Sequence, residues 1–138
     1  MTDVGSGYLV DSNVLLDILT RDPTWYEWSA AALARAARTS SVRINPLIFA
    51  ELSGRLSSLE TLEALLPAGV LKRAPLPYEA AFLASQAFIA YRRRGGDKRS
   101  PMPDFYIGAH AAVHGLTLIT RDVGRYRTYF PTLKLITP

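Results

Sequence analysis

Four carboxylates stand at positions where a folded chain usually avoids an acid or uses it only as a helix cap. One follows the apolar run YLV at 8–10, one follows LTLIT at 116–120, one opens a helical segment after Pro103, and one interrupts an apolar helical stripe. Carboxylate and water oxygens are the ligands that hard cations such as Mg²⁺ take. The sequence therefore predicts one divalent-metal site that gathers Asp11, Glu51, Asp104 and Asp122.

Each acid also has a plainer interpretation. Asp11 is a favoured N-cap for the helix that follows it, Asp104 complements the dipole of a first helical turn, and Asp122 suits a turn. Glu51 has the strongest functional case, because its place in the apolar stripe predicts that it points toward the core. A carboxylate buried there is expected to be paired or metal-bound.

Short apolar strands alternate with helices along the chain, and these elements must position the acids. Strands are predicted at 8–10, 42–45, 70–73, 116–120 and 133–136. Helices are predicted at about 14–19, where apolar residues recur at helical spacing, from the Asp22-Pro23 cap to about 39, from Pro46 to about 56, from a Ser57/Glu60 capping box to 67, from Pro77 to the RRRGG segment at 92–96, and from Pro103 to Gly115. This alternation indicates an α/β fold whose mostly parallel sheet is covered on both faces.

Composition excludes several classes of protein. With 138 residues the chain matches a single domain spanning 1–138, and without cysteine it has no disulfide, thiol nucleophile or Cys-based zinc site. We find no signal-peptide pattern and no membrane-length apolar run, so we expect a cytoplasmic protein with no membrane partner. The net charge of +4 around an acidic site favours a polyanionic substrate.

A basic cluster precedes Asp104 and could follow the phosphates of such a substrate, although arginines at a helix C-terminus also complement its dipole. The candidate phosphate-binding residues are Arg92, Arg93, Arg94, Lys98, Arg99 and Arg121.

Two further pairs have less specific interpretations. His110 and His114 have the spacing of a zinc pair, but position 111 is alanine where HExxH places its glutamate, so we predict structural or surface roles. Trp25 and Trp28 are predicted to pack or to form a partner interface.

Four segments together resemble the PIN domain, in particular the VapC-type toxins of type II toxin-antitoxin systems. They are VDSNVLLD at 10–17, IFAEL with Glu51, PDFYIGAHA at 103–111 and LITRD at 118–122. The resemblance implies an α/β/α sandwich, an endoribonuclease dependent on Mg²⁺ or Mn²⁺, inhibition by a cognate antitoxin, and frequent homodimerisation. It makes the four acids the catalytic and metal-binding quartet, with Asn13 and Thr120 as supporting residues.

Two other functions remain open at this point. A Mg²⁺-dependent phosphatase or phosphotransferase with an aspartyl nucleophile would also place an aspartate after its first strand. Such an enzyme requires a second aspartate two residues later, and this chain has Asn13 at that position. A catalytically inert RNA-binding domain is the other alternative, and four intact acids count against it.

Overall fold

Five short strands form an all-parallel sheet at the centre of the computed structural model, which describes residues 7–56, 58–96 and 102–138. The strands are β1 (Tyr8–Val10), β2 (Val42–Ile44), β3 (Leu71–Arg73), β4 (Thr117–Ile119) and β5 (Leu135–Ile136). They lie in the order β3-β2-β1-β4-β5. The chain therefore leaves β1 toward one side of the sheet and later continues on the other side. All five carboxyl ends lie along the same edge.

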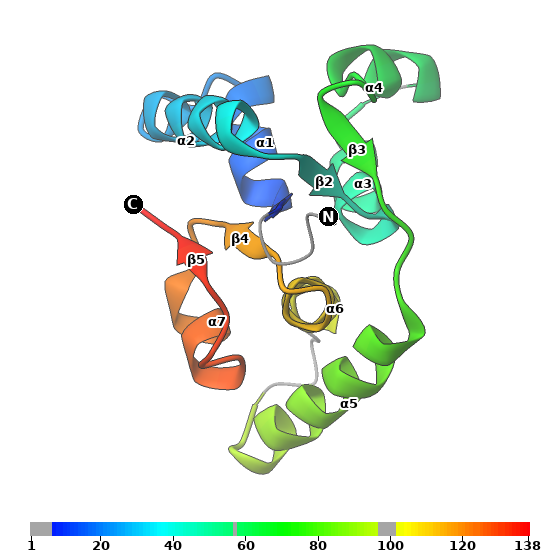
Figure 1. Cartoon of the computed structure of the whole chain (residues 1–138), viewed down its shortest axis with the longest axis vertical. Helices are drawn as coiled ribbons and strands as arrows, with labels where there is room; N and C mark the ends of the chain where they lie inside the picture. The colour runs from blue at the N-terminus through cyan, green and yellow to red at the C-terminus, as the bar shows by residue number, and fades with distance from the viewer. Residues whose placement is uncertain (1–6, 57, 97–101) are drawn as a thin grey trace.

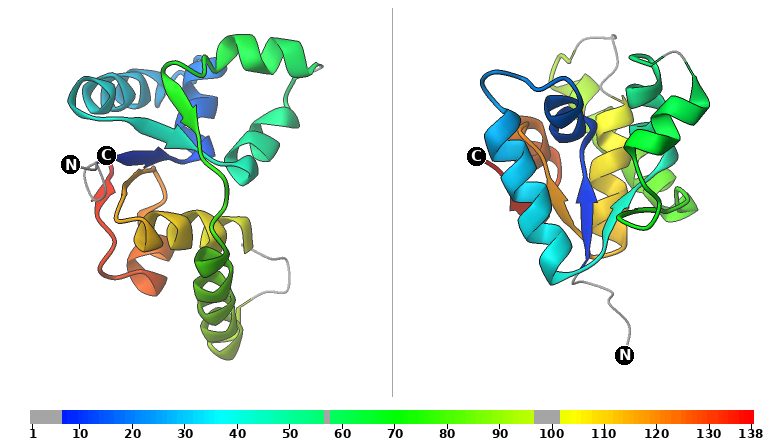
Figure 2. Two further views of the ribbon diagram at one scale, coloured as in Figure 1. Left: turned by 45° about the vertical axis from the view of Figure 1, so that its right-hand side comes forward. Right: turned by 90° about the horizontal axis from the view of Figure 1, so that it is seen from above.

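Helices cover both faces of this sheet. They are α1 (Ser12–Leu19), α2 (Tyr26–Thr39), α3 (Pro46–Ser53), α4 (Leu59–Leu65), α5 (Tyr78–Arg93), α6 (Met102–Val113) and α7 (Val123–Tyr129). Helices α1 and α2 lie on one face, and α5, α6 and α7 lie on the other (Figures 1 and 2). Helix α3 contacts both α1 and α6. The predicted α/β/α sandwich is confirmed.

Side-chain caps explain where several helices begin. Asp11 caps α1 through the Ser12 amide, and the Asn45 side chain accepts from the Ile48 amide at the start of α3. Helix α4 is capped by Ser58, whose hydroxyl accepts from the Thr61 amide. The capping box predicted at Ser57 falls on a residue outside the described ranges.

Some predicted boundaries differ from the structure. Helix α3 ends at Ser53 rather than near 56, and α2 begins at Tyr26, because Asp22 caps the turn before it by accepting from the amides of Thr24 and Trp25. Helix α7 was not predicted at all. Asp122 suited a turn in the sequence, but it is followed by seven helical residues.

The core is built from the short strands and from one tight helix contact. Leu9, Val10, Leu118 and Ile119 are fully buried, as is Phe105 on α6. A Cβ added to Gly108 would lie 2.7 Å from the Phe130 ring, so α6 can approach the α7 region only with glycine there. The next closest ring to that Cβ would be Tyr126, at 3.1 Å. None of the helices in the described ranges is long and apolar enough to cross a membrane.

Candidate active site

The register of β1 and β4 places Asp11 next to the hydroxyl group of Thr120. Leu9 pairs with Leu118 and Val10 with Ile119, so the next residues, Asp11 and Thr120, meet at the carboxyl edge of the sheet. The Thr120 hydroxyl donates to Asp11 Oδ2 at 2.8 Å. This edge is where the chain switches direction across the sheet, the place where open α/β folds bind their ligands.

Asp11 is buried but well supplied with donors. Its Oδ1 accepts from the Ser12 amide at 2.8 Å, and its Oδ2 accepts from the Tyr126 hydroxyl at 3.1 Å in addition to Thr120. Burial raises the pKa of Asp11 to about 6, the charge of Asp104 adds to this, and the hydrogen bonds oppose it. The carboxyl group is thus costly to ionise in the free protein.

Asn13 and Thr120 connect the surrounding elements. Asn13 Nδ2 lies 3.4 Å from both Asp11 Oδ2 and Thr120 Oγ1, and Asn13 Oδ1 accepts from the Arg121 amide at 3.3 Å. The Thr120 hydroxyl also accepts from the Asp122 amide at 3.0 Å. These two residues therefore hold Asp11 and the backbone of Asp122 in one network.

Glu51 reaches the site from α3, but not from the core. It is exposed, whereas its neighbours Ile48 and Leu52 are fully buried, so the prediction that it points into the core was wrong. The buried stripe of α3 is narrow, and Glu51 lies one position to its side, facing α1. Its Oε1 accepts from the Ser12 hydroxyl at 2.6 Å, and partial loss of hydration together with the charge of Asp104 raises its pKa.

Asp104 and Asp122 share an arginine. Arg125 Nη1 lies 2.5 Å from Asp104 Oδ2 and 3.7 Å from Asp122 Oδ2. Burial raises the pKa of Asp104, the Arg125 guanidinium opposes that rise, and the Asp122 charge adds to it. Asp122 follows β4 at the sheet edge and is the N-cap residue of α7, although its side chain makes no capping hydrogen bond.

The four acids act on one another electrostatically. Asp104 raises the pKa of Asp11 and of Glu51, and Asp122 raises that of Asp104. Across the described residues, no three acids or histidines are close enough to form a ready ligand cage. An all-oxygen donor set of this open kind suits Mg²⁺, which keeps several waters and takes only one or two carboxylates directly.

Ser12 and Tyr126 were missed as contributors to the site, and the link that Arg125 makes between two of the acids was not predicted. Ser12 binds Glu51, Tyr126 binds Asp11, and Arg125 joins Asp104 to Asp122. Tyr126 is fully buried, and burial followed by the neighbouring acids raises its pKa well above 10, so it stays a hydrogen-bond donor. The available signal was that Arg125 and Tyr126 lie three and four residues after Asp122, one helical turn if a helix starts there.

The basic residues predicted to bind phosphate differ in their surroundings: Arg121 is held in an ion pair, whereas the arginines at 92–94 are exposed. Arg121 donates to Asp17 through Nε at 2.6 Å and Nη2 at 3.0 Å, and its guanidinium lies 4.9 Å from the Trp25 ring centre, which favours a structural role. The arginines at 92–94 are exposed at the end of α5. Lys98 and Arg99 lie outside the described residues.

The tryptophans and histidines mostly have structural roles. Trp25 and Trp28 are partly buried, and Trp28 packs against the core. His110 is fully buried, and burial lowers its pKa to about 4. Its Nδ1 lies 3.0 Å from Asn45 Nδ2, so this ring supports the residue that caps α3, the helix of Glu51.

The PIN domain family model matches residues 8–131, so the chain belongs to the PIN domain family. Comparison with curated proteins gave no significant match. Several solved structures share the fold over nearly the whole chain.

One is FitAcB from Neisseria gonorrhoeae, with 25% identity, a TM-score of 0.67, and coverage of 95% of this chain and 97% of that one. VapBC2 from Rickettsia felis, bound to a promoter DNA fragment, has 18% identity, a TM-score of 0.70, and coverage of 94% and 97%. VapBC-5 from Mycobacterium tuberculosis, a member of the VapBC family of toxin-antitoxin systems, has 19% identity, a TM-score of 0.61, and coverage of 96% and 99%.

Proposed function

We propose that this PIN-domain chain is a metal-dependent endoribonuclease that acts as the toxin of a toxin-antitoxin pair. The observation that carries the proposal is the meeting of four carboxylates at the switch point of a parallel sheet, each within electrostatic reach of another. Solved structures of similar fold include toxin-antitoxin complexes, which supports the toxin role.

The four acids form the metal-binding site in this proposal. Asp11, Glu51, Asp104 and Asp122 would hold Mg²⁺ or Mn²⁺. Bound there, a divalent ion supplies an activated water and neutralises charge at the attacked phosphate. Asp11 has its free lone pair on Oδ1, because Oδ2 already accepts from Thr120 and Tyr126.

The phosphotransferase alternative is less well supported. That reaction needs a second acid near the aspartyl nucleophile to protonate the leaving group. Asn13 stands there, and both ends of its amide are engaged in hydrogen bonds. A passive RNA-binding domain would have no use for three acids whose pKa values are raised by crowding and burial.

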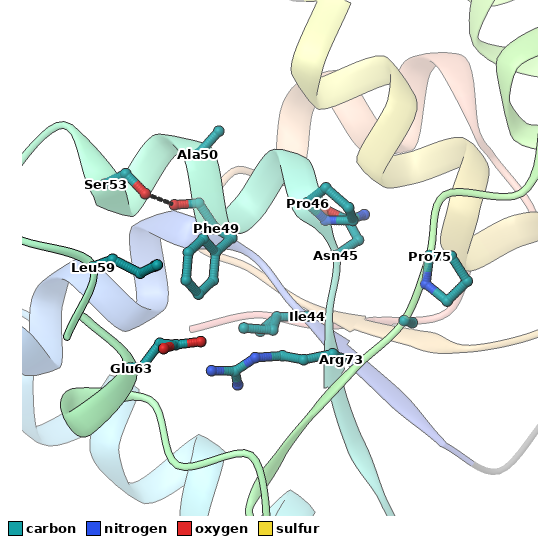
Figure 3. Close-up of a pocket in the computed structure, with 11 residues that line it drawn as sticks. Ile44, Asn45, Pro46, Phe49, Ala50, Ser53, Leu59, Glu63, Arg73 and Pro75 are labelled. Atoms are coloured by element: carbon teal, nitrogen blue, oxygen red, sulfur yellow. Dashed lines mark hydrogen bonds between the residues drawn. The ribbon is translucent and has the colours of Figure 1, made fainter. Parts of the chain in front are cut away.

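We propose a cavity beside α3 as the place where an antitoxin segment docks (Figure 3). It measures about 700 Å³ and its wall is mostly apolar, including Pro46, Phe49 and Leu59. Glu63 and Arg73 line the same cavity, and the Arg73 guanidinium lies 5.5 Å from the Phe49 ring centre. An apolar side chain next to a charged one on the antitoxin would fit this lining. Trp25 and Trp28, also predicted to pack or to form a partner interface, are partly buried, so we favour the cavity as the docking site.

We propose that two copies of the chain associate through the outer face of α5. Tyr78 is 93% exposed, Phe82 68% and Ile89 46%, at helical spacing on one side of this helix. In an antiparallel pair of α5 helices, Phe82 of one copy would meet Ile89 of the other, and the acidic start of each helix would meet the arginines at the end of its partner. Phe82→Glu should yield monomers by light scattering, whereas Leu65→Glu, at an apolar site on α4 that is 46% exposed, should not.

The function is tested by mapping cleavage sites in total cellular RNA. Purified chain with Mg²⁺ should cut at a defined set of sites, and Asp11→Asn should cut at none of them. Glu27→Gln, which removes an exposed carboxylate on α2, is the matched control. Release of inorganic phosphate from small esters, without RNA cleavage, would overturn the assignment in favour of a phosphatase.

A further inference from the structure

Arg125 places a positive charge where the proposed site would hold its cation. A single nitrogen, Nη1, contacts Asp104 at 2.5 Å and lies 3.7 Å from Asp122. The arginine side chain is 31% exposed and those of its two partners are 26% and 40% exposed, so the group borders solvent. Within the described part of the chain, no ion pair reaches Asp11 or Glu51. Arg125 therefore offsets the negative charge of Asp104 and Asp122 but not that of Asp11 and Glu51.

This contact has a consequence for the geometry of the site. While the guanidinium holds Asp104, that carboxylate is directed toward α7. The described residues contain no ready cage of three ligands. A dication and a guanidinium repel each other at such distances, so both cannot neutralise Asp104 fully at once. Cation binding should therefore loosen Arg125 from Asp104.

A released Arg125 has both the room and the chemistry to hold a phosphate. Its side chain is already 31% exposed, so the guanidinium can turn toward solvent without displacing a neighbouring element. A guanidinium binds phosphate oxygens through two parallel N–H groups. Arg121 is not available for this, since two of its nitrogens are held by Asp17.

We propose that Arg125 is the phosphate-binding residue of the site. It acts as counter-ion to Asp104 and Asp122 in the metal-free protein, and it turns to the phosphate of RNA when a divalent ion takes its place. This inference rests on the proposed nuclease function and assigns a role within it. Arg125 competes with the metal in the free enzyme and contributes to substrate binding in the loaded one.

The first test measures Mn²⁺ binding alone, by calorimetry and by the electron paramagnetic resonance of free Mn²⁺. Arg125→Gln should bind Mn²⁺ about tenfold more tightly than the unchanged chain, the size expected when one unit charge is removed near a dication at a water-exposed site. Arg125→Lys keeps the charge and should bind nearly as the unchanged chain does. Arg127→Gln, two residues along the same helix and exposed, is the matched control and should change nothing.

The second test measures cleavage of a short RNA at saturating Mn²⁺. Arg125→Gln and Arg125→Lys should both raise KM about tenfold, because neither offers the paired N–H groups, and Arg127→Gln should leave KM unchanged. Circular dichroism and melting curves check that each variant folds.

The outcomes separate the two proposals. If the unchanged chain binds no Mn²⁺ and cuts no RNA, the nuclease assignment fails. If it does both but Arg125→Gln binds Mn²⁺ equally or less tightly, Arg125 only supports the carboxylates structurally, and the inference about Arg125 is overturned. An unchanged KM in the glutamine variant would overturn its phosphate role.

Discussion

Replacing Asp11 by asparagine should change the free energy of unfolding in a way that depends on pH. Asp11 is 3% exposed, and its pKa rises from 3.8 to about 6 on folding. That rise corresponds to about 3 kcal/mol of destabilisation when the group is ionised in the native state. Asparagine removes this penalty, and it loses one or two hydrogen bonds worth about 1 kcal/mol each. At pH 8 and without metal, Asp11→Asn should therefore be about 1 kcal/mol more stable than the unchanged chain.

The pH dependence separates the effect of the carboxylate charge on the free energy of unfolding from the effect of the lost hydrogen bonds. Because the folded pKa lies above the unfolded one, the native state binds more protons between about pH 6 and pH 4, and the unchanged chain gains stability there as pH falls. The gain from pH 8 to pH 5 is about 1.4 kcal/mol. The advantage of Asp11→Asn should disappear over the same interval.

Urea unfolding in EDTA at pH 8 and pH 5 measures both quantities. Glu27→Gln again serves as the control, and its effect should differ little between the two pH values. An equal effect of Asp11→Asn at both pH values would refute the claim that Asp11 is costly to ionise. A loss of several kcal/mol at pH 8 would mean instead that its role as the cap of α1 dominates.

Three further predictions concern activity and stability. Glu51→Gln and Asp104→Asn should each reduce RNA cleavage by roughly 100-fold or more, since even outer partners of metal ligands typically cost 10- to 100-fold. Asp122→Asn should lose less than Asp104→Asn, because the Asp122 side chain is more exposed than that of Asp104. Thr120→Val should lower Mg²⁺ affinity by about 10- to 100-fold through Asp11, measured by titration of activity with Mg²⁺, and an unchanged titration would contradict its supporting role. Folding lowers the pKa of His110 from 6.5 to about 4, so the unchanged chain should lose about 2 kcal/mol of unfolding free energy between pH 7 and pH 5, whereas His110→Gln should not. If urea unfolding showed the same pH dependence for both proteins, a buried neutral imidazole would be excluded.

The sequence was sufficient to predict the sheet and the elements that carry the acids. Asp11 follows a strand whose neighbour β4 ends at the same level, so the pairing of parallel strands alone places Thr120 beside it. Local signals such as the Asn45-Pro46 pair correctly predicted the start of α3. These features depend on residues close together in the sequence or on the geometry common to all parallel sheets.

Contacts set by tertiary packing could not be predicted in the same way. Tyr126 reaches Asp11 across 115 positions from a seven-residue helix that contains a glycine and shows no clear apolar period. Glu51 was placed on the wrong side of α3, because the width of a buried stripe depends on which helices pack against it. Trp25 was predicted to pack or to form a partner interface, and its contact with Arg121 could not be foreseen from sequence spacing.

The central claim is that this acidic site uses metal-activated water to hydrolyse RNA, and the end groups of the products test it most directly. An RNA oligonucleotide with a mapped cleavage site, incubated with Mg²⁺ and examined by mass spectrometry, should yield 5′-phosphate and 3′-hydroxyl ends. EDTA and Asp11→Asn should each abolish these products. Ends carrying 2′,3′-cyclic phosphate, or cleavage that persists in EDTA, would show that the ribose hydroxyl attacks without metal and would contradict the proposed mechanism.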